Sequence, residues 1–199
     1  MPKSPENSVH PKTRKEWRAW LEKNHTRQQG IWLITYKKAT GKSRIDYGEA
    51  VEDALCFGWV DSKGNKLDDE RSMLWMAPRK RGSKWSKLNK ERVEKLTRAG
   101  LMAPAGRAKV EAAKLDGTWF ALDAVEELEI PTDLEAALDE NPPAKGFFDA
   151  FPRSAKRGIL EWILNAKRPE TRAKRIAETV KLAAKNIRAN QWHPKKEQT

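Results

Sequence analysis

Residues 78–92, PRKRGSKWSKLNKER, combine cations, hydroxyls and an indole ring where a turn leads into a helical pattern. The first turn of a helix leaves backbone N–H groups unpaired and carries a partial positive charge, so it favours a phosphate, sulfate or carboxylate. Guanidinium and ammonium groups add full charges, and indole rings offer flat faces for a base or ring. The predicted anion-binding residues are Arg79, Arg81, Ser83, Lys84, Trp85, Ser86, Asn89, Arg92, Trp59 and Asp61.

A structural role for the same residues is the competing interpretation. Ser86 then caps the helix, Trp85 packs in the core, and the cations form a solvated rim, as runs of charge usually do. Asn89 falls on the inward face of the helix, where its amide either braces the loop or faces a ligand. Both interpretations require the helix to begin at Ser86.

A second group of cations recurs at helical spacing along the last part of the chain. Such a stripe suits the phosphates of a nucleic acid or an anionic membrane surface, and a solvated outer face is the competing interpretation. Neither a helix-turn-helix spacing nor an RNP-type aromatic motif accompanies it. The predicted phosphate-contacting residues are Arg168, Arg172, Lys174, Lys181, Lys185 and Arg188.

Motifs for enzymatic chemistry are scarce. The three histidines, which lie far apart in the chain, are His10, His25 and His193. This spacing favours neither a histidine metal site nor a triad, and no Walker loop, GxSxG elbow or GxGxxG turn occurs. Cys56 lies in an apolar stretch and is expected to be a buried small hydrophobe. For Asp61, an ion pair with Arg79 or Arg81 is favoured over acid–base work. No cofactor and no metal are predicted.

Composition places the chain among folded, soluble proteins. Its 199 residues include nine Trp, whose large apolar surfaces need packing partners, and this excludes a disordered chain. The mean hydropathy is -0.84. No apolar run approaches the roughly 20 residues that a membrane span needs. The N-terminus lacks the apolar core of a signal peptide, and a single Cys cannot form an internal disulfide, so we expect a cytoplasmic protein.

The net charge of +12 is unevenly distributed along the chain. Residues 45–70 and 116–152 are acidic, and the segments on either side of them are basic. Acidic blocks can dock on basic ones, so the net charge describes solubility and encounter rather than the identity of a partner.

Strand signals occur only in the first half of the chain, where they alternate with helical ones. Runs rich in β-branched and aromatic residues predict antiparallel strands at 30–38, 59–62 and 71–78. Apolar periodicity predicts helices at about 13–27, 46–56, 86–99 and 104–117. The predicted N-caps are Thr13, Asp46, Ser86, Thr132 and Ser154. The fold class is therefore α+β: helices around a small antiparallel sheet, followed by an all-helical C-terminal subdomain.

The acidic, aperiodic stretch after residue 115 is the best boundary between the two halves. Beyond it every predicted element is a helix, and the last helix opens at Pro169. The predicted organisation is a flexible tail at 1–11, an α+β domain at 12–117, an acidic linker at 118–131, a helical subdomain at 132–190 and a tail at 191–199.

Three stretches resemble a known bacterial family. They are ALCFGWVDS with PRKRGSKWSKLNKERV, then GLMAPAGRAKVEAAKLDGTW, then AKRGILEWILNAKRPETRAKRI. Over about residues 12–188 the chain is similar to the bacteriocin-protection, YdeI/OmpD-associated family, with GSKWSKLN and AKRPETRAKRI the most specific segments. The resemblance implies a link to tolerance of bacteriocins or cationic antimicrobial peptides, or to an outer-membrane porin. It carries over no catalytic residue, cofactor or substrate.

Together these features predict a non-enzymatic cytosolic protein with a regulatory or stress-linked role. Its expected partner is an anionic small molecule or a protein, recognised through the junction between Arg79 and Arg92. Two alternatives stay open. One is nucleic-acid binding by the basic C-terminal helix, and the other is a small-molecule enzyme that uses Asp61 and a cationic pocket.

Overall fold

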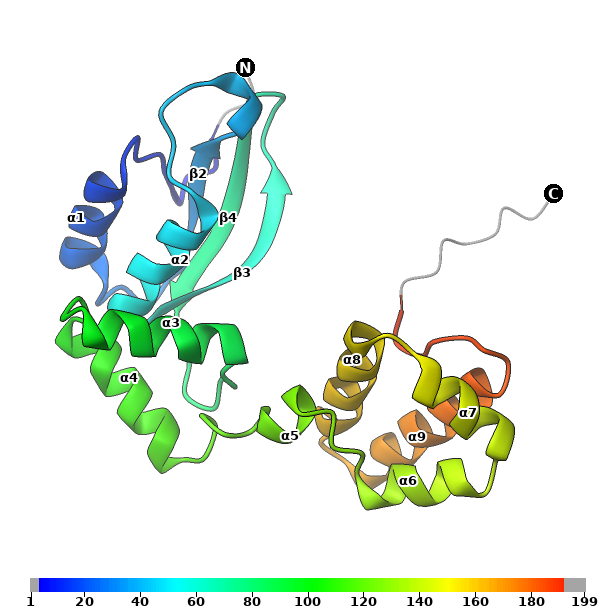
Figure 1. Cartoon of the computed structure of the whole chain (residues 1–199). Coiled ribbons are helices and arrows are strands. Elements are labelled where there is room, and N and C mark those ends of the chain that lie inside the picture. Colours follow the sequence, from blue (N-terminus) through cyan, green and yellow to red (C-terminus); the bar gives the residue numbers. More distant parts are fainter. Residues whose placement is uncertain (1–3, 192–199) are drawn as a thin grey trace. The chain divides into compact units, whose positions relative to one another are not determined.

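The computed structural model describes residues 4–191. By their internal contacts the residues divide into two compact units, Met1–Ala121 and Leu122–Thr199. One small sheet with surrounding helices lies in the N-terminal unit, and helices alone make up the described part of the C-terminal unit (Figure 1). The α+β class is therefore confirmed. His193 and all of the predicted C-terminal tail except Gln191 lie outside the described residues.

The sheet of the N-terminal unit has the strand order β1-β2-β4-β3. Strand β4 (Arg71–Pro78) is central and pairs antiparallel with both β2 (Ile31–Tyr36) and β3 (Trp59–Lys66). Alternate side chains of these strands point to the helices, so apolar residues such as Leu33 and Met76 enter the core from the same face.

Two segments differ from the sequence prediction. Strand β3 continues through residues 63–66, beyond the predicted strand at 59–62, because a register shift between Asp61 and Gly64 absorbs the irregularity. Residues 8 and 9, in the predicted tail, form the short strand β1 (Ser8–Val9) parallel to β2. The sheet is therefore mixed rather than wholly antiparallel.

The longer helices of the N-terminal unit pack around α2, and one short 3-10 helix follows β2. They are α1 (Arg14–Asn24), the 3-10 helix η1 (Lys38–Thr40), α2 (Tyr47–Cys56), α3 (Lys87–Arg98) and α4 (Pro104–Leu115). Helix α2 contacts α1, β3, α3 and α4 (Figure 1). Asp46 and Glu49 form the predicted capping box at its start. Any ligand site on the inner face of the sheet is therefore bounded by α2.

Helix α4 approaches α2 closely at Gly106. A Cβ atom at this position would lie 2.2 Å from the carbonyl oxygen of Cys56. The N–H of Ala103, just before α4, donates to the same oxygen at 3.1 Å. The absence of a side chain at residue 106 thus brings α4, with its basic residues, against the end of α2.

Aromatic side chains dominate the core of this unit. Trp17 and Trp59 are fully buried, and their indole N–H groups donate to the carbonyl oxygens of Ala50 and His25, both at 3.0 Å. Cys56 is buried among them, and its burial raises the pKa of the thiol. These residues serve packing, as buried Trp and Cys usually do.

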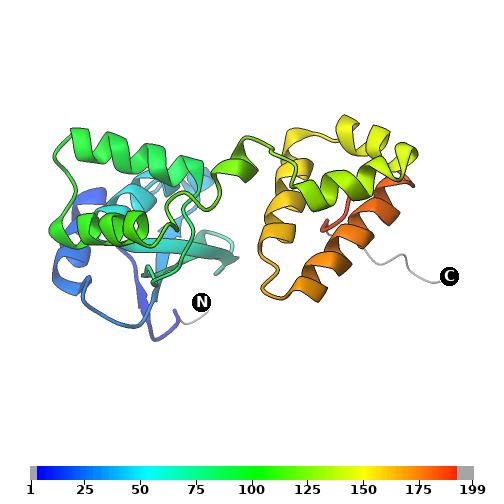
Figure 2. The same cartoon turned by 90° about the horizontal axis from the view of Figure 1, so that it is seen from below.

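The C-terminal unit is a small helical bundle organised by its last helix. Its helices are α5 (Asp123–Glu126), α6 (Thr132–Asp139), α7 (Pro142–Ala150), α8 (Arg153–Leu164) and α9 (Pro169–Ala183). Helix α9 packs against α6, α7 and α8 (Figure 2). No helix in residues 4–191 has the length and apolar character needed to cross a membrane.

Two N-caps predicted in this unit are wrong. Helix α6 begins at Thr132 itself and α8 begins at Arg153, one residue before Ser154. Pro131 and Pro152 occupy the cap positions, with φ of -63° and -57°. Proline fixes the backbone angle at the entry of a helix, so the chain starts each helix there without a side-chain cap.

Candidate functional site

The structure places eight of the ten predicted anion-binding residues in three groups, of which the first is buried; Lys84 and Asp61 belong to none of them. Arg79 is 4% exposed, Trp85 is 1% exposed and Trp59 is fully buried. The guanidinium of Arg79 lies over the Trp85 ring, 3.7 Å from its centroid, and its Nη1 donates to the Lys84 carbonyl oxygen at 3.0 Å. Neither the Arg79 guanidinium nor the two indole rings present a surface to a ligand in this conformation.

Arg79 places a positive charge inside the unit. Burial lowers the pKa of Arg79 to about 10, and the negative charge of Asp61 acts against this. The guanidinium therefore stays charged at neutral pH. Nε of Arg79 and Nε1 of Trp85 are buried donors that have no acceptor among the described protein atoms. The stacked pair braces the loop that leads into α3 and adds positive potential beneath it.

The second group surrounds a hollow of about 220 Å³ between the turn at residues 80–83 and α4. We call it the basic hollow; its cations are Lys80 and Arg81 from the turn and Lys109 from α4. None of the three has an ion-pair partner within the described part of the chain. Gly82, at φ +80°, leaves open space above the turn. Lys109 was not among the predicted residues.

One carboxylate, Asp116, also lines the basic hollow. It accepts hydrogen bonds from the hydroxyl of Thr118 at 2.6 Å and from the Thr118 N–H at 3.1 Å. These bonds lower the pKa of Asp116, and Arg81 contributes a smaller electrostatic effect in the same direction. The three cations and this carboxylate leave the lining with an excess of positive charge.

The third group lies at the start of α3. Ser86 is its N-cap and accepts a hydrogen bond from the Asn89 N–H at 3.4 Å. Oδ1 of Asn89 accepts from Nη1 of Arg92 at 3.0 Å. Asn89 thus joins the helix start to a side chain one turn later, which is the bracing arrangement.

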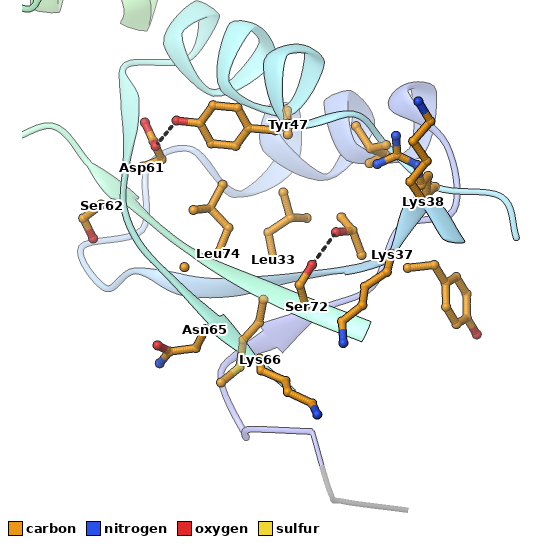
Figure 3. A pocket seen from close by; sticks show the side chains of 17 residues that line it. Leu33, Lys37, Lys38, Tyr47, Asp61, Ser62, Asn65, Lys66, Ser72 and Leu74 are labelled. Atoms are coloured by element: carbon orange, nitrogen blue, oxygen red, sulfur yellow. Dashed lines mark hydrogen bonds between the residues drawn. The ribbon is translucent and has the colours of Figure 1, made fainter. Parts of the chain in front are cut away.

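Asp61 pairs with neither Arg79 nor Arg81. Its Oδ2 accepts a hydrogen bond from the hydroxyl of Tyr47 at 2.7 Å (Figure 3). Burial of the hydroxyl end, helped by this bond, raises the pKa of Tyr47 to about 12, although Arg92 acts against the shift. The Tyr47 ring itself is exposed, so the pair stands where a surface groove meets the interior.

That groove, which we call the sheet groove, has a volume of about 730 Å³. It lies between the inner face of the sheet and the start of α2 (Figure 3). Its lining comes from four separate segments: residues 33–38, 44–50, 61–66 and 72–74. Sequence reasoning missed the groove because only the tertiary structure brings these segments together. Asp61, the third residue of β3, was the one predicted site residue that lines the groove.

The predicted stripe does not run along one helix, because α9 ends at Ala183 and Lys185 and Arg188 lie beyond it. Its residues are for the most part exposed. Arg168, Lys174, Lys181, Lys185 and Arg188 are exposed. Arg172 differs, because its Nε and Nη2 donate to Asp133 at 2.6 and 2.8 Å, and this hydrogen bonding raises the pKa of Arg172. Within residues 4–191 no group of three or more His, Cys, Asp or Glu is placed to hold a metal ion.

Two protein families match the chain, one in each of its two compact units. Residues 9–109, just over half of the 199, match a family described as domain of unknown function (DUF8412). The chain belongs to the DUF8412 family. Residues 127–186 match the family described as bacteriocin-protection, YdeI or OmpD-associated, which confirms that resemblance for the C-terminal unit. No curated protein and no solved structure shows significant similarity to the chain.

The two matches assign the segments that carry the resemblance to two different families. The segment AKRPETRAKRI lies in the YdeI/OmpD-associated region, whereas GSKWSKLN lies in the DUF8412 region. The resemblance over residues 12–188 is therefore shared between two families. The sheet groove and the junction from Arg79 to Arg92 both belong to the DUF8412 domain.

Proposed function

We propose that this protein is a non-enzymatic binding protein that takes up a small oxyanion in the basic hollow. The observation that carries the proposal is the placement of Lys80, Arg81 and Lys109 around one cavity without ion-pair partners in the described chain. Like charges held close together repel one another, so a bound anion lowers the electrostatic repulsion among these three cations.

The remaining lining suits an oxyanion. A volume of about 220 Å³ accommodates a phosphate or sulfate group together with water. The Ser83 hydroxyl supplies a donor, and Gly82 lets backbone amides come close to an oxyanion. The buried charge of Arg79 lies next to the turn in the chain and strengthens the positive potential there. Under this proposal Arg81 and Ser83 have the role that the sequence predicts for them.

The family match suggests the setting of this activity. The description of the C-terminal family names protection against bacteriocins, and we extend that link to this chain as part of the proposal. A cytoplasmic protein that senses an anion during envelope stress fits both the family description and the basic hollow.

Titration with inorganic phosphate tests the oxyanion site. We expect saturable shifts of the backbone amide signals of Gly82 and Ser83 in two-dimensional NMR spectra. In the double variant Arg81→Gln/Lys109→Gln the affinity should fall at least tenfold, because one charge-assisted hydrogen bond contributes about 1.5–3 kcal/mol. The matched control, Lys181→Gln/Lys185→Gln, removes the same charge from two exposed positions at the end of α9 and just beyond it, and should bind phosphate as the wild type does.

An equal loss of phosphate affinity in the two double variants would show that phosphate binding depends only on the net charge of the protein. Absence of saturable shifts at Gly82 and Ser83 would make the basic hollow a solvated surface. Either result overturns the proposal.

Nucleic-acid binding is a second candidate, favoured by the exposed cations on α9 and just after its end. Lys174, Lys181 and Lys185 are exposed and have no ion-pair partner within residues 4–191. Such a face can release counterions from a phosphate backbone, and this release makes binding depend steeply on salt.

Fluorescence anisotropy with a labelled DNA duplex tests this candidate. Affinity should fall by at least tenfold between about 50 and 200 mM salt, and Lys181→Glu/Lys185→Glu should abolish binding. The control, Lys15→Glu/Lys23→Glu, makes the same charge change on exposed positions of α1. A wild type that does not bind at low salt, or two variants that lose binding equally, would remove nucleic-acid binding by α9.

A further inference from the structure

The sheet groove has two unlike ends with an apolar floor between them. Asp61 and the Tyr47 hydroxyl stand at one end, and Lys37 and Lys38 stand at the other (Figure 3). Asp61 is opposite Met76 on β4, whereas Ser72, near the lysine end, is four residues earlier on the same strand. At about 3.4 Å per residue the two ends are roughly 14 Å apart.

The lysine end carries positive charge that nearby carboxylates do not offset. Each carboxylate there already has its own cation: Glu70 with Lys42 at 2.7 Å, Asp69 with Lys66 at 2.6 Å and Asp68 with Arg71 at 2.7 Å. Lys37 and Lys38 form no ion pair with a carboxylate among the described residues.

The two remaining lysines differ in how they are held. Nζ of Lys37 donates to the backbone carbonyl oxygens of Asp68 and Asp69 at 2.8 and 2.9 Å, so its position is set without use of a carboxylate. Lys38 is exposed and has no side-chain partner in the described chain. Both residues line this end of the groove, which therefore carries two positive charges.

Hydroxyl groups stand beside these cations. The side chains of Thr35 and Ser72 face each other across β2 and β4, with their oxygens 3.4 Å apart (Figure 3). Either hydroxyl can turn to donate to an anion, since the bond between them is long. Ammonium groups with adjacent hydroxyls are the donors that recognise a carboxylate or phosphate head.

The middle of the groove is apolar. Leu33, Leu74 and Ile45 line it, and the exposed ring of Tyr47 stands above them. Leu33 and Ile45 are buried, so the apolar surface open to a ligand comes from the half-buried Leu74 and the exposed Tyr47. Covering this surface with a hydrocarbon body removes apolar area from water. At the far end Asp61 accepts one bond from Tyr47 and retains lone pairs for a polar donor.

We infer that the sheet groove binds an amphipathic organic anion, with its anionic head at Lys37 and Lys38 and its hydrocarbon body on Leu74 and Tyr47. The charge complementarity at the lysine end sets the orientation of the ligand, and the apolar floor supplies much of the affinity. This site is separate from the basic hollow and does not depend on the function proposed for it.

Three eight-carbon probes test the inference on the full-length protein: octanoate, octyl phosphate and octyltrimethylammonium. We expect octanoate or octyl phosphate to bind with saturable heat in calorimetry and to shift the methyl NMR signals of Leu33 and Leu74. The cationic probe should bind at least tenfold more weakly than the better anion. A preference between the two anions identifies the head group as carboxylate or phosphate.

Lys38→Glu is the informative variant, because Lys38 makes no side-chain contact whose loss would disturb folding. Lys38→Glu should lower the affinity for the better-binding anion about tenfold or more, since an attractive charge becomes a repulsive one. Lys15→Glu, an equal change at an exposed position of α1, is the matched control and should leave binding unchanged.

Three results would overturn the inference: equal affinity for cationic and anionic probes, equal effects of Lys38→Glu and Lys15→Glu, or methyl shifts confined to other parts of the protein. Binding of octyl phosphate at the basic hollow alone is distinguished by the variants. In that case binding would be lost in Arg81→Gln/Lys109→Gln and retained in Lys38→Glu.

Discussion

Replacing Gly106 with alanine is expected to destabilise the N-terminal unit by more than about 3 kcal/mol, above the usual range for overpacking. The added Cβ would lie 2.2 Å from the Cys56 carbonyl oxygen and 2.7 Å from the Leu55 carbonyl oxygen. Both are backbone atoms, so no side chain can move aside to make room. Helix α4 must therefore separate from α2, which also displaces Lys109 from the basic hollow.

Urea unfolding followed by tryptophan fluorescence measures this effect. The fluorescence reports mainly on the N-terminal unit, whose Trp residues are Trp17, Trp20, Trp32, Trp59, Trp75, Trp85 and Trp119. Gly48→Ala in α2 is the matched control, because nothing lies within 4 Å of its added Cβ. It should stabilise the unit by up to about 1 kcal/mol through the lower backbone entropy of alanine. Similar midpoints for the two variants would show that α2 and α4 are not in close contact.

Phe148→Ala is expected to remove about 3–5 kcal/mol from the stability of the C-terminal unit. Phe148 is fully buried on α7, and its ring centroid lies 6.0 Å from that of Phe151. The unfolding free energy of a small domain is only about 5–15 kcal/mol, so this cavity should unfold much of the unit at physiological temperature. Its neighbour Phe147 is 39% exposed, and Phe147→Ala should cost less than about 1 kcal/mol.

Two-dimensional NMR separates the responses of the two units. In Phe148→Ala we expect the amide signals of residues 122–191 to collapse to unfolded positions, while those of residues 4–121 keep their dispersion. Loss of dispersion in both halves would instead make the chain a single cooperative unit. Retention of all signals would place Phe148 outside the core.

Local patterns predicted most of the helices and strands. Thr13, Asp46 and Ser86 cap helices as their spacing indicates, because a short side chain reaches the backbone only a few residues away. The strand at residues 71–78 has its predicted bounds. The caps at Thr132 and Ser154 failed because the preceding prolines already set the entry of each helix.

The candidate sites were only partly predictable. Arg81 and Ser83 line the basic hollow, as their place in a cationic turn suggests, but Lys109 joins them only because Gly106 lets α4 approach α2. Arg79 belongs to the same charged run and yet is buried against Trp85. The sequence does not show which cation of a run turns inward, because that depends on the space left between packed elements.

The sequence by itself determined the α+β class and the YdeI/OmpD-associated resemblance of the C-terminal unit, because apolar periodicity, capping residues and family segments are local properties of the chain. Only the tertiary structure decided which residues line the two candidate sites. Lys37, Asp61 and Leu74 come from three different strands or their ends, and pairing in the sheet brings them to one groove. A site of this kind depends on contacts between distant segments, and no local pattern encodes it.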